Sequence, residues 1–259
     1  YGTCGIGNGA DRIYARFAAD IARRKADIRL KKTGCFGFCA REPLVTVHRP
    51  GAPALVLGDL QEKEIGGIVS ALLSDKPSPL ARRALCKIEE WDFRTARVEY
   101  GKGYPSVPRW NEIPFFKGQE KIVLRDSGLI DPEDIEEYIA VGGYSALARA
   151  LGDMTPKGII QEIKNSGLRG RGGAGFPTGK KWELMARAAG DIKYMICNAD
   201  EGEPGAYMNR NEIESDPHML IEGMAIGAYA MNVRQGFMYV RAEYPLAVER
   251  LEKALTQAR

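Results

Sequence analysis

The sequence is poor in histidine, has no long apolar run and carries almost no net charge, and each shortage excludes a class of protein. Only His48 and His218 are present, so neither a Ser-His pair nor a histidine-based metal site can be assembled. No apolar run approaches the roughly 20 residues of a membrane-spanning helix, and no signal peptide is visible. The net charge of +3 is too small to indicate nucleic acid as a partner. We therefore predict a cytoplasmic protein that neither inserts directly into a membrane nor binds nucleic acid.

Cysteine occurs in an odd number and in an arrangement that does not suggest disulfides. The five cysteines are not spread like a disulfide framework, which favours a reducing compartment with metal-bound or buried thiols. Hydrophobic residues make up 44% and charged residues 27% of the sequence, as in a globular protein. The length of 259 residues suffices for one large domain or two ordinary ones. The sequence starts with Tyr1 rather than Met, so we expect that residues are missing upstream.

Hydrophobic spacing predicts a small α/β domain in residues 1–75. Apolar residues recur at helical spacing in one segment near the start and in a second one that closes the domain, and three short segments between them have strand character. The predicted helices are 10–25 and 60–73, and the predicted strands are 27–34, 44–51 and 53–60. Residues 76–115 are charged and punctuated by proline, which predicts an extended connector draped over a surface.

The remaining residues, 116–259, predict a second α/β body with a mostly parallel sheet. Its helices carry clear start signals, such as Thr155 followed by Pro156 and Asp131 followed by Pro132. The predicted elements are a strand at 120–128, helices at 131–151, 155–167 and 181–189, a buried strand at 193–199, a helix at 216–232 and a strand at 235–244. Helices that alternate with strands are typical of α/β folds.

A glycine-rich, basic loop interrupts this body at residues 167–182, GLRGRGGAGFPTGKKW. Its glycines at 170, 172, 173 and 175 let backbone N–H groups approach an anion, and Arg169, Arg171, Lys180 and Lys181 surround them. The helix that follows adds a partial positive charge. The loop is neither a Walker loop nor the usual dinucleotide fingerprint, because no Gly-Lys-Ser/Thr ends it and a helix precedes it. The alternative is a glycine-rich surface loop that binds no ligand. We expect instead that the loop binds a phosphorylated cofactor.

A polar cluster, CNADEGEPGAY at residues 197–207, follows the second predicted strand of this body. Asn198, Asp200, Glu201 and Glu203 would lie at the carboxyl end of the sheet, where open α/β sheets bind ligands. Such groups can hydrogen-bond a flavin or position a nicotinamide. A solvated acidic turn or a Mg²⁺ site are the alternatives.

These two motifs, SGLRGRGGAGFPTGKKW and CNADEGEPGAYMNRNEIESDPHMLIEGM, resemble the NADH-oxidising flavoprotein subunit of respiratory complex I and its relatives in NAD-linked, often electron-bifurcating hydrogenases and formate dehydrogenases. Residues 114–144 are more similar to the hydrogenase branch. The resemblance implies a Rossmann-like FMN- and NAD(H)-binding domain. FMN would be held by Gly170, Arg171, Gly172, Lys181, Asn198, Asp200 and Glu201. Gly173, Phe176, Lys181 and Glu203 would face the nicotinamide nucleotide, with Phe176 on the adenine.

The sequence departs from this family in two respects. Leu184 stands where family members often have a second aromatic near the adenine. The family continues beyond the position of Arg259 with a Gly-Glu-Glu segment, an Asn-Asn segment, a ubiquitin-like domain and a four-cysteine iron–sulfur bundle. The resemblance therefore implies a truncated chain, with the 4Fe-4S cluster in the missing part.

The N-terminal cysteines carry a further resemblance. Cys4 and the Cys35-x-x-x-Cys39 pair resemble the thioredoxin-like ferredoxin domain, which ligates a 2Fe-2S cluster with four cysteines. Three candidates are present, and the fourth either precedes Tyr1 or has been lost. Cys86 and Cys197 are expected to be ordinary thiols.

Three functions follow as alternatives. The first is a flavoprotein subunit that transfers electrons between NAD(P)H and iron–sulfur clusters through FMN, with a thioredoxin-like ferredoxin subunit and further redox subunits as partners. In it, Glu203 would influence how the nucleotide is held in the two redox states. The second is a non-catalytic scaffold or relay subunit that docks a redox partner. The third is a phosphate-binding enzyme without flavin. The final electron acceptor and the choice between NADH and NADPH stay open.

Overall fold

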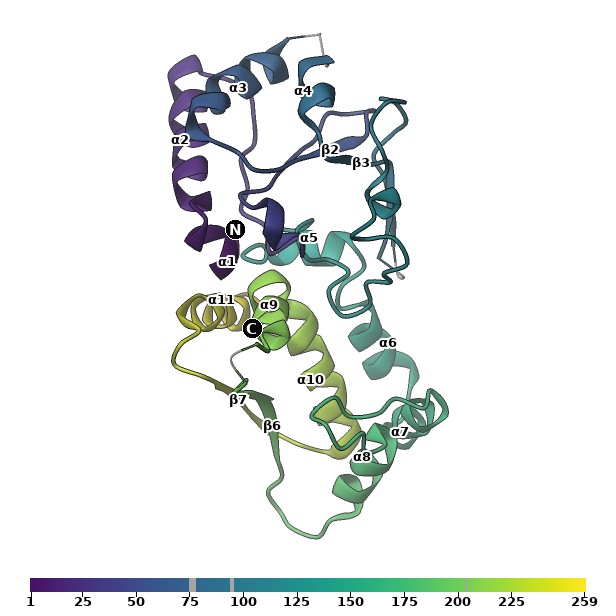
Figure 1. The fold of residues 1–259 in the computed structure, drawn as a ribbon. Coiled ribbons are helices and arrows are strands. Elements are labelled where there is room, and N and C mark those ends of the chain that lie inside the picture. Colours follow the sequence, from purple (N-terminus) through teal and green to yellow (C-terminus); the bar gives the residue numbers. More distant parts are fainter. Residues whose placement is uncertain (75–77, 94–95, 204) are drawn as a thin grey trace.

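The computed structural model describes residues 1–74, 78–93, 96–203 and 205–259, whose helices and strands gather in two bodies (Figure 1). The N-terminal body carries α1 to α4, and the C-terminal body carries α6 to α11. Both chain ends lie at the junction between the bodies. Residues 75–77, at the start of the predicted connector, residues 94–95 within it and Pro204 of the predicted acidic turn lie outside the described residues.

The N-terminal body packs helices on a three-stranded antiparallel sheet of order β1-β2-β3. Its elements are α1 (Thr3–Gly7), α2 (Ala10–Arg24), β1 (Val45–Val47), β2 (Ala54–Leu57), α3 (Ile65–Leu73) and β3 (Cys86–Ile88). Strand β2 is buried along its whole length, and Phe17 of α2 and Ile65 of α3 pack against it in one core cluster. The predicted helices at 10–25 and 60–73 and the strands at 44–51 and 53–60 are confirmed.

The predicted strand at 27–34 is wrong, because this segment finds no partner. Residues 27–34 run without strand pairing and lie across a cavity of about 600 Å³ from β1. Ile28 and Leu30 still pack partly against the core, which explains their apolar character. A strand needs a neighbour for its backbone hydrogen bonds, and β1 pairs only with β2 among the described residues.

The segment predicted as an extended connector instead forms regular structure. It contains α4 (Ser78–Arg83), β3, the antiparallel pair β4 (Glu90–Asp92) and β5 (Arg97–Glu99), and the short helix η3 (Trp110–Glu112). Cys86 and Ile88 of β3 are buried and join the sheet beside β2. The apolar residues of this charged stretch thus complete the N-terminal sheet, while the domain boundaries at 75 and 115 stay predictions.

The C-terminal body packs helices against a two-stranded parallel sheet, β6 (Tyr194–Ala199) and β7 (Gln235–Val240). Its helices are α6 (Ser145–Asp153), α7 (Pro156–Asn165), α8 (Thr178–Arg187), α9 (Met208–Ser215), α10 (Pro217–Met231) and α11 (Pro245–Gln257). Helix α5 (Ile135–Ala140) lies at the junction, where Tyr138 packs in one core cluster with residues of β2 and β3. Helix α10 is central and packs against α6, α7, α8 and α11. The mixture of helices and strands confirms the α/β class, and the parallel pair confirms the expected sheet type.

Several predicted details of this body are wrong. Residues 120–128 form turns rather than a strand, with Ile122 and Val123 exposed and Asp126 buried. The predicted helix 131–151 is two helices, because the chain adopts positive φ at Gly142 (93°) and Tyr144 (60°) between them.

The start of the first of these helices and the burial of β6 also differ from the prediction. Asp134, rather than Asp131, is the N-cap of α5 and accepts the Glu136 N–H at 3.0 Å. Strand β6 is not buried, since Tyr194 and Ile196 are 49% and 68% exposed. Helices α9 and α11 were not predicted.

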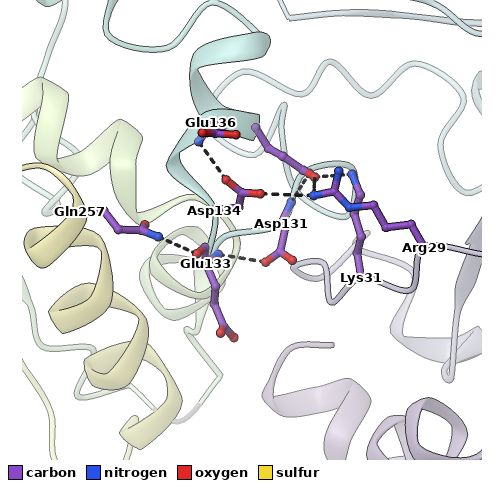
Figure 2. A network of polar contacts seen from close by, with 8 residues as sticks. Arg29, Lys31, Asp131, Glu133, Asp134, Glu136 and Gln257 are labelled. Carbon is purple, nitrogen blue, oxygen red and sulfur yellow. Dashed lines mark hydrogen bonds and ion pairs between the residues drawn. The ribbon is translucent and has the colours of Figure 1, made fainter. Parts of the chain in front are cut away.

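A polar segment leading into α5 contacts the N-terminal body. Figure 2 shows Arg29 and Lys31 reaching from the extended segment 27–34 toward residues 131–137. The Glu137 carboxylate accepts a hydrogen bond from the Lys31 ammonium and lies 3.5 Å from Arg29 Nη2. It also accepts the Asp131 N–H at 2.9 Å. Glu137 is therefore the centre of this side of the junction.

The same segment also contacts the C-terminal body. The Glu133 carbonyl accepts Gln257 Nε2 of α11 at 2.8 Å (Figure 2), and the Glu133 carboxylate lies 2.8 Å from Lys253 Nζ. Residues 131–137 thus join the N-terminal body to α11.

Candidate functional site

The glycine-rich loop forms a closed hairpin between α7 and α8. The Gly170 N–H donates to the Phe176 carbonyl at 2.9 Å, and the Thr178 N–H donates to the Leu168 carbonyl at 2.9 Å. Thr155 caps the preceding helix by accepting the Gly158 N–H at 3.1 Å, as predicted. Residues 168–174 between these anchors are exposed, so their backbone is open to a ligand.

Different physical reasons explain why glycine occupies each of these positions in the loop. Gly173 and Gly175 have φ of 104° and 60°, values that favour glycine. Gly172 has neither a positive φ nor any atom within 4 Å of an added Cβ, so the fold itself gives no reason for a glycine there. Gly179 was missed by the sequence reasoning: a Cβ there would lie 2.6 Å from Lys164 N, so this glycine lets α8 approach α7.

The cations of the loop remain available for an anion. Arg169, Arg171, Lys180 and Lys181 are all exposed, and within the described part of the chain none of them forms an ion pair. The Arg171 guanidinium donates to the Arg169 carbonyl. The loop therefore presents uncompensated positive charge at the start of α8, an arrangement that suits phosphate groups. Phe176, at 45% exposure, lies beside this charge in the sequence.

The acidic turn after β6 contains both exposed side chains and one carboxylate that is hydrogen-bonded within the fold. Asn198 Oδ1 accepts the Asp200 N–H at 3.0 Å, and Asn198, Asp200 and Glu203 are exposed. Glu201 is half-buried, and its carboxylate accepts the N–H groups of Asn209 at 3.0 Å and of Arg210 at 3.1 Å. Glu201 thus satisfies the free N–H groups at the start of α9 and holds the turn in place.

The turn has two further partners that the sequence reasoning missed. The Arg241 guanidinium donates to the Glu201 carbonyl, and Tyr244 Oη lies 3.4 Å from Glu201 Oε2. A signal for them exists in the sequence: both follow a strand that pairs in parallel with β6, so both must lie at the same sheet edge as the acidic turn. The acidic turn is therefore held by α9 and by the residues after β7.

The three candidate thiols lie near one another in the N-terminal body. Burial raises the pKa of Cys35 to about 12, with Cys39 and Cys4 as nearby groups that act in the same direction. Burial and the neighbouring Cys4 raise the pKa of Cys39. Among residues 1–74, 78–93, 96–203 and 205–259, no group of three or more His, Cys, Asp or Glu is arranged to hold a metal ion. The residues present do not form a complete four-thiolate site, and ligation by Cys4, Cys35 and Cys39 stays a prediction.

The other thiols and the histidines have ordinary surroundings. Cys86 is buried in β3 and Cys197 is partly buried in β6. His218 is 1% exposed and lies between Tyr144 Oη at 2.8 Å and Gln257 Oε1 at 3.1 Å. Burial lowers the pKa of His48, whose ring lies against Tyr100.

Comparison with known proteins finds a family match in the region that contains the two motifs. The family description "Nuo51 FMN-binding domain" matches residues 163–259. The chain is 54% identical over 143 residues to the NADP-reducing hydrogenase subunit HndC of Solidesulfovibrio fructosivorans, covering 55% of this chain and 29% of that protein. It is 50% identical over 139 residues to an NADH-quinone oxidoreductase subunit of Rhizobium meliloti, covering 54% and 33%. Over 158 residues it is 42% identical to an NADH-quinone oxidoreductase subunit of Aquifex aeolicus, covering 61% and 36%.

The match to solved structures is weaker. An air-oxidised NAD+-reducing [NiFe]-hydrogenase aligns with 99% of this chain and 39% of its own, at 22% identity and a TM-score of 0.43, too low to support an argument. The chain spans between 29% and 36% of the length of the three relatives named above. Within the described residues, every helix is too short or too polar to span a bilayer. The segment that matches the Nuo51 FMN-binding domain is the one that carries both the glycine loop and the acidic turn.

Proposed function

We propose that this chain is the FMN- and nicotinamide-nucleotide-binding part of a flavoprotein subunit that transfers electrons between NAD(P)H and iron–sulfur clusters. One observation carries the proposal: the family match at 163–259 contains both the acidic turn and the exposed glycine loop, whose four cations form no ion pair with any described residue. The names of the relatives, a hydrogenase subunit and quinone oxidoreductase subunits, support a role as one subunit of a larger oxidoreductase.

The loop residues fit a phosphorylated ligand. Gly170 and Gly172 would bring the backbone close to the ligand, and Arg171 and Lys181 would neutralise phosphate charge. The open space around Gly172 supports this role, because a ligand rather than the fold would require the missing side chain. When bound, FMN would accept a hydride from the nicotinamide and would pass on the two electrons one at a time. Gly173 and Phe176 would face the nucleotide, with Phe176 on the adenine.

The acidic turn would orient the ligand rather than react. Asn198, Asp200 and Glu203 are exposed, so the Asn198 amide would donate to a ligand and the two carboxylates would accept from it. Glu201 would act indirectly, since its carboxylate already caps α9 and so fixes the turn. Glu203 would influence the affinity for the nucleotide in the two redox states without acting as a proton donor.

Several wider features belong to the same proposal. The partners would be a thioredoxin-like ferredoxin subunit and further iron–sulfur subunits, and the protein would work in the cytoplasm. A 2Fe-2S cluster in the N-terminal body would need a further ligand, because the described thiols do not complete its ligand set.

A visible spectrum of the full-length protein supplied with FMN tests the proposal. We expect flavin absorption bands that survive gel filtration and that bleach when NADH or NADPH is added without oxygen. A protein that retains no flavin after supply of FMN overturns the proposal, and flavin that neither nucleotide reduces would leave only a binding role.

A further inference from the structure

Arg210, in the first turn of α9, contacts both the acidic turn and the N-terminal body. Its backbone N–H donates to Glu201 Oε2 at 3.1 Å, so its position is tied to the acidic turn. Its guanidinium Nη2 donates to Cys4 Sγ of α1 at 3.1 Å. In Figure 1, α1 and α9 face each other across the junction of the two bodies. One residue therefore bridges two regions that lie far apart in the sequence.

The guanidinium is held in this position from other sides. It lies over the rings of Tyr207 and Tyr244, with its central carbon 5.1 and 5.4 Å from the ring centroids. Its Nε lies 3.8 Å from Glu214 Oε1. Cation–π and ionic contacts of this kind restrict a long, flexible side chain to one geometry. The contact with Cys4 thus follows from the placement of α9.

Helix α9 is also fastened to α1 by a second residue. The buried Glu214 carboxylate accepts the Thr3 N–H at 2.8 Å and the Thr3 hydroxyl. Thr3 directly precedes Cys4, so a shift of α9 must move the backbone of the thiol or break these bonds. The cap at Glu201 therefore connects mechanically to Cys4 through α9.

We propose that Arg210 is a positioning residue that couples the acidic turn to the thiols of the N-terminal body. A ligand that moves Glu201 changes the surroundings of Cys4, and a chemical change at Cys4 alters ligand affinity by the same factor, because coupling between sites is reciprocal. This inference rests on the proposed function for the identity of the ligand, whereas the contact between Arg210 and Cys4 does not.

A double-mutant cycle on the full-length protein measures the coupling. The dissociation constant of FMN is determined for the wild type, Cys4→Ser, Arg210→Met and the double variant. We expect Cys4→Ser to change the constant roughly two- to tenfold in the wild type and by less than about 1.5-fold when Arg210 is already methionine. Equal effects in both backgrounds overturn the inference. Arg234→Met, at an exposed arginine outside this network, is the matched control and should leave the Cys4→Ser effect intact.

A second readout needs no flavin. The rate of Cys4 alkylation by iodoacetamide is measured by mass spectrometry, with Cys197 of β6 as the internal reference. We expect Glu201→Gln, which weakens the cap of α9, to change the Cys4 rate at least about twofold in the wild type and not in Arg210→Met. An unchanged rate in the wild type overturns the coupling. If the wild type binds no FMN, the proposed function fails and the alkylation rates still decide this inference.

Discussion

At the scale of single residues, Gly173 gives the most direct test of the loop. We expect Gly173→Val to lower FMN or nucleotide affinity more than about tenfold, because a branched side chain would occupy the space of ligand approach. Its φ of 104° adds backbone strain of roughly 1–3 kcal/mol. Gly51→Val is the matched control, since Gly51 has φ of 74° and equally open surroundings.

Flavin content and thermal unfolding of both variants separate the two effects. Gly51→Val should unfold at a similarly lowered temperature and keep its flavin. Normal flavin content and NADH oxidation in Gly173→Val would remove the loop from the site.

Glu203 tests the acidic turn without disturbing it. The carboxylate is exposed, so Glu203→Gln should leave the fold unchanged and FMN bound. We expect the balance of affinity between NAD(P)H and NAD(P)+ to change, with a coupling of ~1–3 kcal/mol as the typical scale. The reason is that reduction by NADH would leave negative charge on a flavin bound beside this carboxylate.

Nucleotide titrations of the oxidised and the reduced full-length protein measure this effect. Identical affinities for wild type and variant in both states would show that Glu203 is a plain turn carboxylate. Glu201→Gln serves as a contrast, because loss of the charged cap of α9 should lower stability by about 1 kcal/mol.

At the scale of elements, the contact between α7 and α8 depends on Gly179. A Cβ at Gly179 would lie 2.5 Å from Lys164 Cγ and 2.8 Å from Lys164 Cα, and backbone cannot move aside as a side-chain end can. We expect Gly179→Ala to lower the free energy of unfolding by roughly 1–3 kcal/mol. Gly152 also lies in a helix, but no atom lies within 4 Å of a Cβ added there. The free energy of unfolding of Gly152→Ala should therefore equal or exceed that of the wild type. Thermal unfolding of the two variants makes the comparison, and equal stability would contradict the close approach.

The start of α10 predicts a pH-dependent stability. Asp216 is the N-cap of α10 and accepts the Met219 N–H at 3.1 Å, and it neighbours Asp126 in a site where both are at most 2% exposed. Burial raises the pKa of both carboxyls, and the facing Arg125, 3.5 Å from Asp126 Oδ1, opposes this only partly. Since the folded pKa values lie above the unfolded ones, the folded protein binds more protons, and stability falls as pH rises from about 4 through the raised values.

Asp126→Asn removes one titrating group while keeping the shape of the side chain. We expect this variant to be more stable than the wild type at about pH 8 and to show a flatter dependence of unfolding free energy on pH. Denaturant unfolding between about pH 4 and 8 measures it. A wild type whose stability rises across this range would contradict the raised pKa values.

At the scale of the whole molecule, residues 131–137 hold the junction between the two bodies. Glu137 contacts Arg29 and Lys31, whereas the neighbouring Glu136 contributes its backbone N–H to Asp134 (Figure 2). We expect Glu137→Gln to lower the unfolding temperature by roughly 2–4 °C, the size expected for about 1 kcal/mol in a chain of this length. Glu136→Gln is the control and should change it by much less. The difference should shrink in about 0.5 M NaCl, because salt screens exposed ion pairs, and a salt-independent difference would point to packing instead.

Local chemistry alone determined much of this molecule. Thr155 with Pro156 predicts the start of α7, and the apolar spacing of Ile13 and Phe17 predicts α2, because capping and amphipathic burial depend on neighbours a few positions away. The glycine loop and the acidic turn could be recognised for the same reason: each is one continuous motif. These motifs carry the resemblance to the flavoprotein family, and both lie within the match at residues 163–259.

Tertiary structure decided what depends on distant partners. Residues 27–34 have strand character and no strand, because pairing needs a neighbour that local sequence does not supply. The polar stretch around Cys86 reads as a linker, yet it adds a strand beside Val56. Glu201 reads as a ligand residue, yet its carboxylate caps α9. The contact of Arg210 with Cys4 exists only because α9 packs on α1, and such a long-range contact leaves no periodic trace in the sequence.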